Sequence, residues 1–103
     1  MILHCVFCQF DATAPEAARQ EVLEALRAFS LTLPGVISFD FGPNRDFEQK
    51  SQEFAAGFVI RFASKEALEA YAVHPEHQRL GGELVSLCTN GAAGVVVYDL
   101  EVS

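Results

Sequence analysis

The residues best suited to chemistry are few, and they lie at four places in the chain. His4 lies in the first strand-like segment, Tyr71 and His77 lie on either side of Pro75, and Asp99 lies in the last strand-like segment. An imidazole beside a carboxylate is typical of a general base, because the carboxylate fixes the tautomer of the ring. A phenol hydroxyl can stabilise the enolate that such a base generates. These residue types therefore fit aldol or enolisation chemistry.

The expected strand faces bring these groups within reach of one another. His4 is expected on the same strand face as the apolar Val6, and Asp99 on the same face as apolar residues of its own strand. If the first and last strands are neighbours, both residues face the helices that carry Tyr71 and His77. We predict that His77 is the base, that Asp99 orients it, and that Tyr71 or His4 polarises the substrate.

Each of these residues also has a purely structural explanation. His77 could bond a backbone carbonyl or Asp99, and His4 could be a satisfied core histidine. Tyr71 could belong to the core with its hydroxyl at the rim, and Asp99 could lie in solvent at a strand end. His74 directly precedes a proline, so we expect it to cap a helix or to be exposed.

The remaining reactive residues indicate no metal and no cofactor. Cys5 and Cys8 are three apart, and on a strand such residues face opposite sides, so they are poorly placed to share an ion or a disulfide. With Cys88 the cysteines number three, and an odd count is typical of reduced thiols in a cytoplasm. His74 and His77 could share an ion across one helical turn, but no third ligand lies nearby in the sequence.

Composition excludes several classes of partner. The chain has 103 residues, enough for one domain over 1–103, with 14 acidic and 7 basic side chains and a formal net charge of -7. Such a charge repels nucleic acid and anionic lipid, and no apolar run approaches the roughly 20 residues of a membrane span. We also see no signal peptide, so we expect a cytoplasmic protein without nucleic acid or membrane partners.

The hydrophobic pattern predicts four strands and three helical segments. Thr13 is the expected N-cap of the first helix, Ser64 caps the second, and Pro75 starts the third. Residues 43–53 are polar and are expected to form an exposed loop. The expected strands cover residues 2–10, 36–41, 54–62 and 95–102.

This order, β-α-β-β-α-(α)-β, predicts an α+β protein with a ferredoxin-like fold. Its four-stranded antiparallel sheet would carry the helices on one face, with the first and third strands central. The other face is also apolar, through residues such as Leu3, Phe7, Val96 and Leu100, while Gly57 would let a partner approach closely. We therefore expect a homodimer that packs sheet to sheet as a dimeric α/β barrel.

Several stretches resemble one protein family. After an opening strand that contains His4, the stretches are LPGV at 33–36, FxS at 62–64, AYxxHPxH at 70–77 and VVVYD at 95–99. With them the whole chain resembles the stress-responsive A/B barrel (Dabb) domain family, whose members are dimeric ferredoxin-like barrels. The YxxHPxH block is the specific part of this resemblance.

The resemblance implies a cavity between sheet and helices. In a plant branch of the family, polyketide cyclases that use no cofactor, His77 matches the catalytic histidine, while His4 and Tyr71 match residues of the pocket. This sequence departs from the cyclases at two pocket positions, where Ala56 replaces a histidine and Leu26 replaces a tyrosine.

The sequence leaves the reaction unassigned. The first hypothesis is a homodimer whose cavity binds a small apolar molecule without a defined reaction. The alternatives are a cofactor-independent cyclase or isomerase and a cofactor-free monooxygenase, and whether the protein is an enzyme at all stays open.

Overall fold

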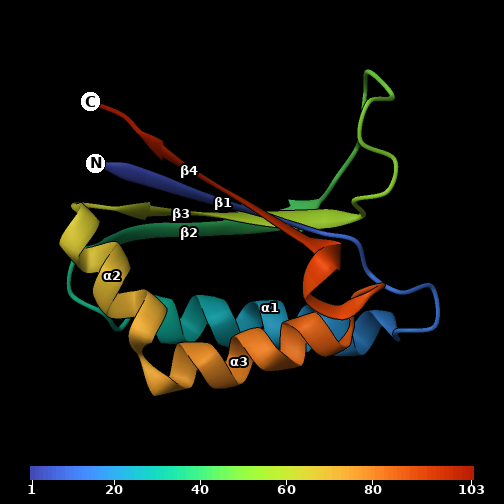
Figure 1. The fold of residues 1–103 in the computed structure, drawn as a ribbon, viewed down its shortest axis with the longest axis horizontal. Coiled ribbons are helices and arrows are strands. Elements are labelled where there is room, and N and C mark those ends of the chain that lie inside the picture. Colours follow the sequence, from blue (N-terminus) through green and yellow to red (C-terminus); the bar gives the residue numbers. More distant parts are fainter.

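The computed structural model describes all 103 residues and places one sheet on a layer of helices (Figure 1). The sheet is antiparallel with strand order β2-β3-β1-β4, which confirms the predicted ferredoxin-like fold with β1 and β3 central. None of the helices is both long and apolar enough to span a bilayer. In chain order the elements are β1 (Ile2–Cys8), α1 (Glu16–Ser30), β2 (Val36–Pro43), β3 (Ala56–Phe62), α2 (Lys65–Val73), α3 (Pro75–Ser86), a 3₁₀ turn (Gly91–Gly94) and β4 (Val95–Glu101).

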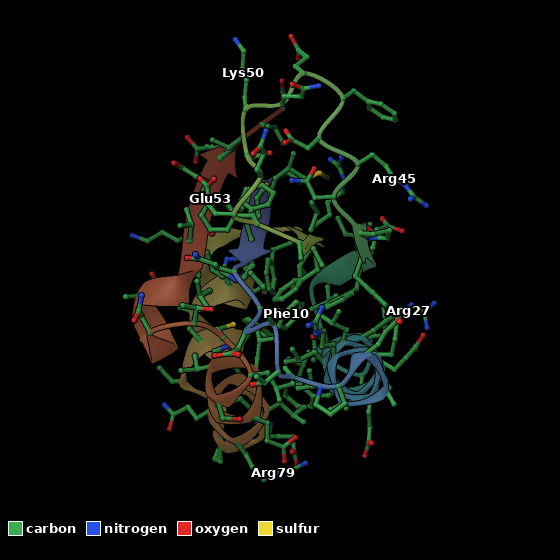
Figure 2. The ribbon with its side chains drawn as sticks, turned by 90° about the vertical axis from the view of Figure 1, so that its right-hand side faces the viewer. Phe10, Arg27, Arg45, Lys50, Glu53 and Arg79 are labelled. Carbon is green, nitrogen blue, oxygen red and sulfur yellow. The ribbon has the colours of Figure 1, made fainter.

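All three helices lie on one side of the sheet, and the long loop between β2 and β3 rises on the other side (Figure 1). Viewed from the end, Arg27 and Arg79 extend from the outer surface of the helical layer (Figure 2). Arg45, Lys50 and Glu53 lie on the loop at the opposite end of the molecule (Figure 2). No helix covers the face of the sheet that lies opposite the helical layer (Figure 1).

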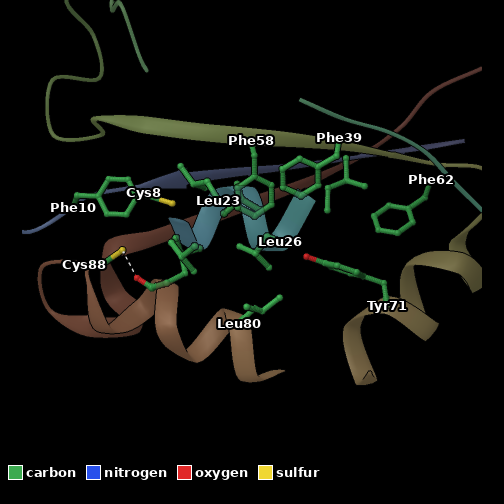
Figure 3. Close-up of a cluster of buried hydrophobic side chains, with 14 of the residues drawn as sticks. Cys8, Phe10, Leu23, Leu26, Phe39, Phe58, Phe62, Tyr71, Leu80 and Cys88 are labelled. Carbon is green, nitrogen blue, oxygen red and sulfur yellow. Dashed lines mark hydrogen bonds between the residues drawn. The ribbon is translucent and has the colours of Figure 1, made fainter. Parts of the chain in front are cut away.

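The core fills the space between the sheet and the helices (Figure 3). Val6, Phe58, Ile60 and Phe62 point from the central strands toward the helices and are buried, as is Leu26 of α1. Alternate residues of the same strands face away from the helices, as the period of two requires. Burying large apolar side chains of this kind stabilises the fold by about 1.5–3 kcal/mol each.

The uncovered face of the sheet is apolar as well, and we call it the open face. Phe7, Tyr98 and Leu100 on this face are 37%, 57% and 51% exposed. The ring of Phe7 packs against Gly57. A Cβ atom at position 57 would lie only 2.9 Å from the edge of this ring. A pocket of about 620 Å³ opens beside these side chains, below the base of the long loop.

Three local predictions at the ends of elements were wrong. Thr13 does not cap α1, because its N–H and hydroxyl both donate to the Asp11 carboxylate, at 2.9 and 2.8 Å, and form a turn before the helix. Phe10 lies beyond the end of β1 and pairs only with Cys88 in an isolated bridge. Phe54 precedes β3 and lines the pocket on the open face instead of the core.

Candidate functional site

A cavity of about 380 Å³ lies between the sheet and the helices α2 and α3. Its wall is mainly apolar, and Phe58 lines it without closing it. Three of the four predicted site residues, His4, Tyr71 and His77, line this cavity, while Asp99 lies behind His4. The cavity is thus an apolar chamber with a small number of polar groups, which is the usual character of a small-molecule site.

His4 and Asp99 are brought together by the register of β1 and β4, in which they are direct cross-strand partners. Nδ1 of His4 lies 2.6 Å from Oδ1 of Asp99, with the two side chains 12% and 45% exposed. A carboxylate only accepts, so Nδ1 of the neutral ring carries the proton and Nε2 keeps a free lone pair. Nε2 of His4 has no hydrogen-bond partner in the protein, and it is not completely buried. The structure therefore pairs Asp99 with His4, whereas the sequence analysis had paired it with His77.

His77 is fixed by the backbone of the preceding helix. Its Nδ1 donates to the carbonyl oxygen of Ala72 at 3.1 Å, which again leaves Nε2 free. This nitrogen faces the next turn of α3, because a Cβ built at Gly81 would lie 3.9 Å from it. Partial burial lowers the pKa of His77 below its ordinary value of 6.5, so the ring is neutral at neutral pH.

Tyr71 lies between the two histidines. Its ring centroid is 5.8 Å from that of His4 and 4.1 Å from that of His77. The side chain is only 1% exposed, and its hydroxyl is directed from α2 toward Leu26 (Figure 3). Burial raises the pKa of Tyr71, so the phenol keeps its proton and remains a hydrogen-bond donor.

The sharp break between α2 and α3 sets the positions of Tyr71 and His77. Ser64 caps α2 by accepting from the N–H of Ala67 at 3.2 Å, as predicted. His74 ends α2 and caps α3, with Nδ1 accepting from the N–H of Glu76 at 3.1 Å. The following proline starts α3 at a position where its missing N–H costs nothing. This break brings Tyr71 and His77, at the two ends of the segment, to the same cavity wall.

The cavity wall includes residues that the sequence analysis did not assign to it, among them Gln78 and Gly81. Gly81 lies four residues after His77 on α3, so the helical period alone could have identified it as a neighbour. No group of three or more His, Cys, Asp or Glu side chains is placed to hold a metal ion.

This geometry combines two imidazoles whose Nε2 atoms have no protein partner with one protonated phenol at a single apolar chamber. Such a set can accept a proton and donate a hydrogen bond to the same bound molecule.

Comparison with known families agrees with this architecture. The model of the stress responsive A/B barrel domain (Dabb) matches residues 2–102. The chain belongs to this family. A search of the curated proteins finds no significant match.

Solved structures similar to this Dabb chain share its fold over nearly the full length. A dimeric ferredoxin-like protein of unknown function from Jannaschia sp. CCS1 is 46% identical, with a TM-score of 0.92 over 98% of each chain. The hydroxynitrile lyase of Passiflora edulis is 12% identical, with a TM-score of 0.84 over 99% of this chain and 93% of that one. An antibiotic biosynthesis monooxygenase-like protein from Nitrosomonas europaea is 13% identical, with a TM-score of 0.78 over 99% and 98%. At 12% and 13% identity, the last two show the fold alone.

Proposed function

We propose that this Dabb protein is a homodimer whose cavity binds a small apolar carbonyl compound and removes a proton next to the carbonyl group without a cofactor. The observation that carries the proposal is the pairing of His4 with Asp99 at the wall of an apolar cavity. This pairing leaves Nε2 of His4 as the proton acceptor. A cyclase or isomerase would both begin with such a step.

His4 is the better of the two candidate bases. When an imidazole takes a proton, the full negative charge of Asp99 stabilises the resulting imidazolium, whereas the Ala72 carbonyl beside His77 carries only a partial charge. Tyr71 would donate its hydrogen bond to the enolate oxygen. His77 would line the site and accept a second hydrogen bond from the bound molecule.

The homodimer would form through the open face. The apolar side chains on this face are unpartnered within the chain, and the relative from Jannaschia is described as dimeric. The three cysteines are all unpaired, which supports a reducing, cytoplasmic location.

Hydrogen–deuterium exchange of a simple ketone tests the chemistry without knowledge of the natural substrate. The dimer is incubated in D₂O with benzyl methyl ketone, and the loss of the α-proton signal is followed by NMR. We expect exchange well above the buffer rate. Asp99→Asn should lower this excess by about 10²-fold, since a positioned general base contributes at least that much. Binding without exchange would refute the catalytic proposal and leave a binding protein.

Two comparisons assign the roles. Glu101→Gln removes a carboxylate two residues farther along the same face of β4 and should leave the exchange rate unchanged. His4→Gln should reduce exchange more than His77→Gln does. The opposite order would make His77 the base and would overturn the assignment of His4.

A further inference from the structure

The open face carries two charged side chains among its apolar ones, Arg61 of β3 and Asp40 of β2. Cross-strand partners share a face of the sheet, and Arg61 is paired in register with Leu3, which in turn is paired with Leu100. Asp40 is paired with Val59, two residues from Arg61 on the same strand face, and it lines the pocket of the open face. The remaining carboxylates of the strands lie on β4 and face the helices, so these two residues are the only charges that the strands place on the open face.

Neither charge is balanced within the chain. The ion pairs of the molecule lie between β1 and β4 and within α2 and α3, and none of them includes Arg61 or Asp40. Nη1 of Arg61 lies 3.0 Å from Sδ of Met1, and a thioether sulfur is only a weak acceptor. Met1 precedes β1, and β1 and β2 flank β3 on opposite sides, so the arginine is turned away from Asp40.

A second chain on the open face would change the surroundings of both charges. Excluding water from a charged group costs free energy unless an opposite charge lies against it. In an isologous dimer every contact between two different residues occurs twice. Arg61 of one chain can therefore meet the partner's Asp40, while Asp40 of the first chain meets the partner's Arg61.

The spacing of the two residues allows this double contact. Asp40 is opposite Val59, so the two charged residues lie about 7 Å apart along the strands and about 5 Å apart across them. Two sheets that pack face to face lie about 10 Å apart, a gap that an arginine and an aspartate side chain bridge together. A two-fold axis midway between the two residues brings each arginine over an aspartate, and it runs more across the strands than along them.

We propose, on the basis of the homodimer in the proposed function, that Arg61 and the partner's Asp40 form two symmetry-related ion pairs that select a second copy of this chain and fix its register on the open face. Two chains with a formal net charge of -7 repel each other at a distance, so a favourable charge contact at this face guides their approach. The apolar residues supply the contact area, and the ion pairs decide which surfaces meet.

Charge reversal tests this pairing. In a homodimer of Arg61→Asp all four contact positions are acidic, and in a homodimer of Asp40→Arg all four are basic. Each variant alone should have a dimer dissociation constant about 100-fold or more above that of the wild type, because like charges are then brought together. Sedimentation velocity over a range of protein concentrations measures the constant, and circular dichroism verifies the fold.

Mixing the two variants separates a contact between chains from a contact within one chain. In a mixed dimer each introduced charge again faces an opposite charge, so native mass spectrometry should find the heterodimer in excess over both homodimers. The chain that carries both reversals should form homodimers again, as the wild type does. Variants that stay dissociated when mixed would overturn the pairing.

Arg27→Asp and Glu24→Arg are the matched controls, since both residues are exposed on α1 and Arg27 extends from the outer surface of the helical layer (Figure 2). Neither should change the dissociation constant. A wild-type chain that sediments as a monomer would refute the homodimer of the proposed function and this pairing with it. A wild-type dimer whose two reversed variants dimerise equally well would refute the pairing alone.

Discussion

At the scale of single residues, the site depends on Nδ1 of two histidines being held by fixed acceptors. Asp99 holds His4 and the Ala72 carbonyl holds His77, so both rings present Nε2. A base and a donor gain catalytic value when they do not reorganise during the reaction. Tyr71 adds the donor, and its raised pKa keeps the proton on the phenol at neutral pH, where His77 is neutral.

His77 makes the stability of the protein depend on acidity. Its pKa is lowered by burial from 6.5, so below that pH the unfolded chain binds a proton that the folded chain resists. Stability should fall as the pH decreases through and below 6.5, and His77→Gln should show a shallower decline. Urea unfolding at a series of pH values and one protein concentration measures this difference. Parallel curves for the two proteins would contradict it.

At the scale of elements, α3 forms one side of the cavity with a glycine at the wall and a second glycine in solvent. Gly81 lines the cavity, whereas Gly82 is exposed and has open space around it. Both positions are helical, and replacing a glycine in a helix interior by a good helix former stabilises it by about 1 kcal/mol. The two positions therefore separate helix stability from cavity volume.

Gly81→Leu should fill the cavity and abolish the binding of benzyl methyl ketone, while the melting temperature stays at or above that of the wild type. Gly82→Leu makes the same change of residue one position away and should leave binding intact. Calorimetric titration and thermal unfolding measure the two effects. Full binding by Gly81→Leu would show that the ligand occupies another place.

The elements and their layers could be predicted from the sequence, because period and capping are local properties. For example, Ser64 is a residue type that favours helix caps and His74 directly precedes a proline, and the structure shows both of them capping a helix. The partner of Asp99 could not be predicted. This partner depends on the register between β1 and β4, the first and last strands of the chain. A shift of one residue in this register would turn Asp99 to the other face of the sheet.

At the scale of the whole molecule, the open face is the surface through which we propose that two chains associate. Apolar side chains of β1 and β4 are exposed there, among them Phe7, Tyr98 and Leu100. Proteins rarely leave such an apolar patch uncovered, which supports our proposal that a second copy of the chain packs on this face.

Val96→Glu combined with Leu100→Glu should convert the dimer to monomer, because two charges per chain would be buried without partners. Sedimentation velocity measures the state of assembly. The control variant, Val73→Glu with Leu31→Glu, adds the same charge outside the sheet, at residues that are 71% and 42% exposed. It should leave the dimer intact. A dimer that survives the first pair would place the interface elsewhere.

The alternation along β1 has a consequence for how this protein can evolve. His4, Val6 and Cys8 face the helices, while Leu3, Cys5 and Phe7 face the other way, within a strand of seven residues. Under the proposed function, mutations in the first set are selected through ligand binding and mutations in the second set through dimer formation. Under the same proposal, a lineage with this strand can change what it binds while its subunits continue to recognise each other, which makes a small barrel a versatile starting point for new activities.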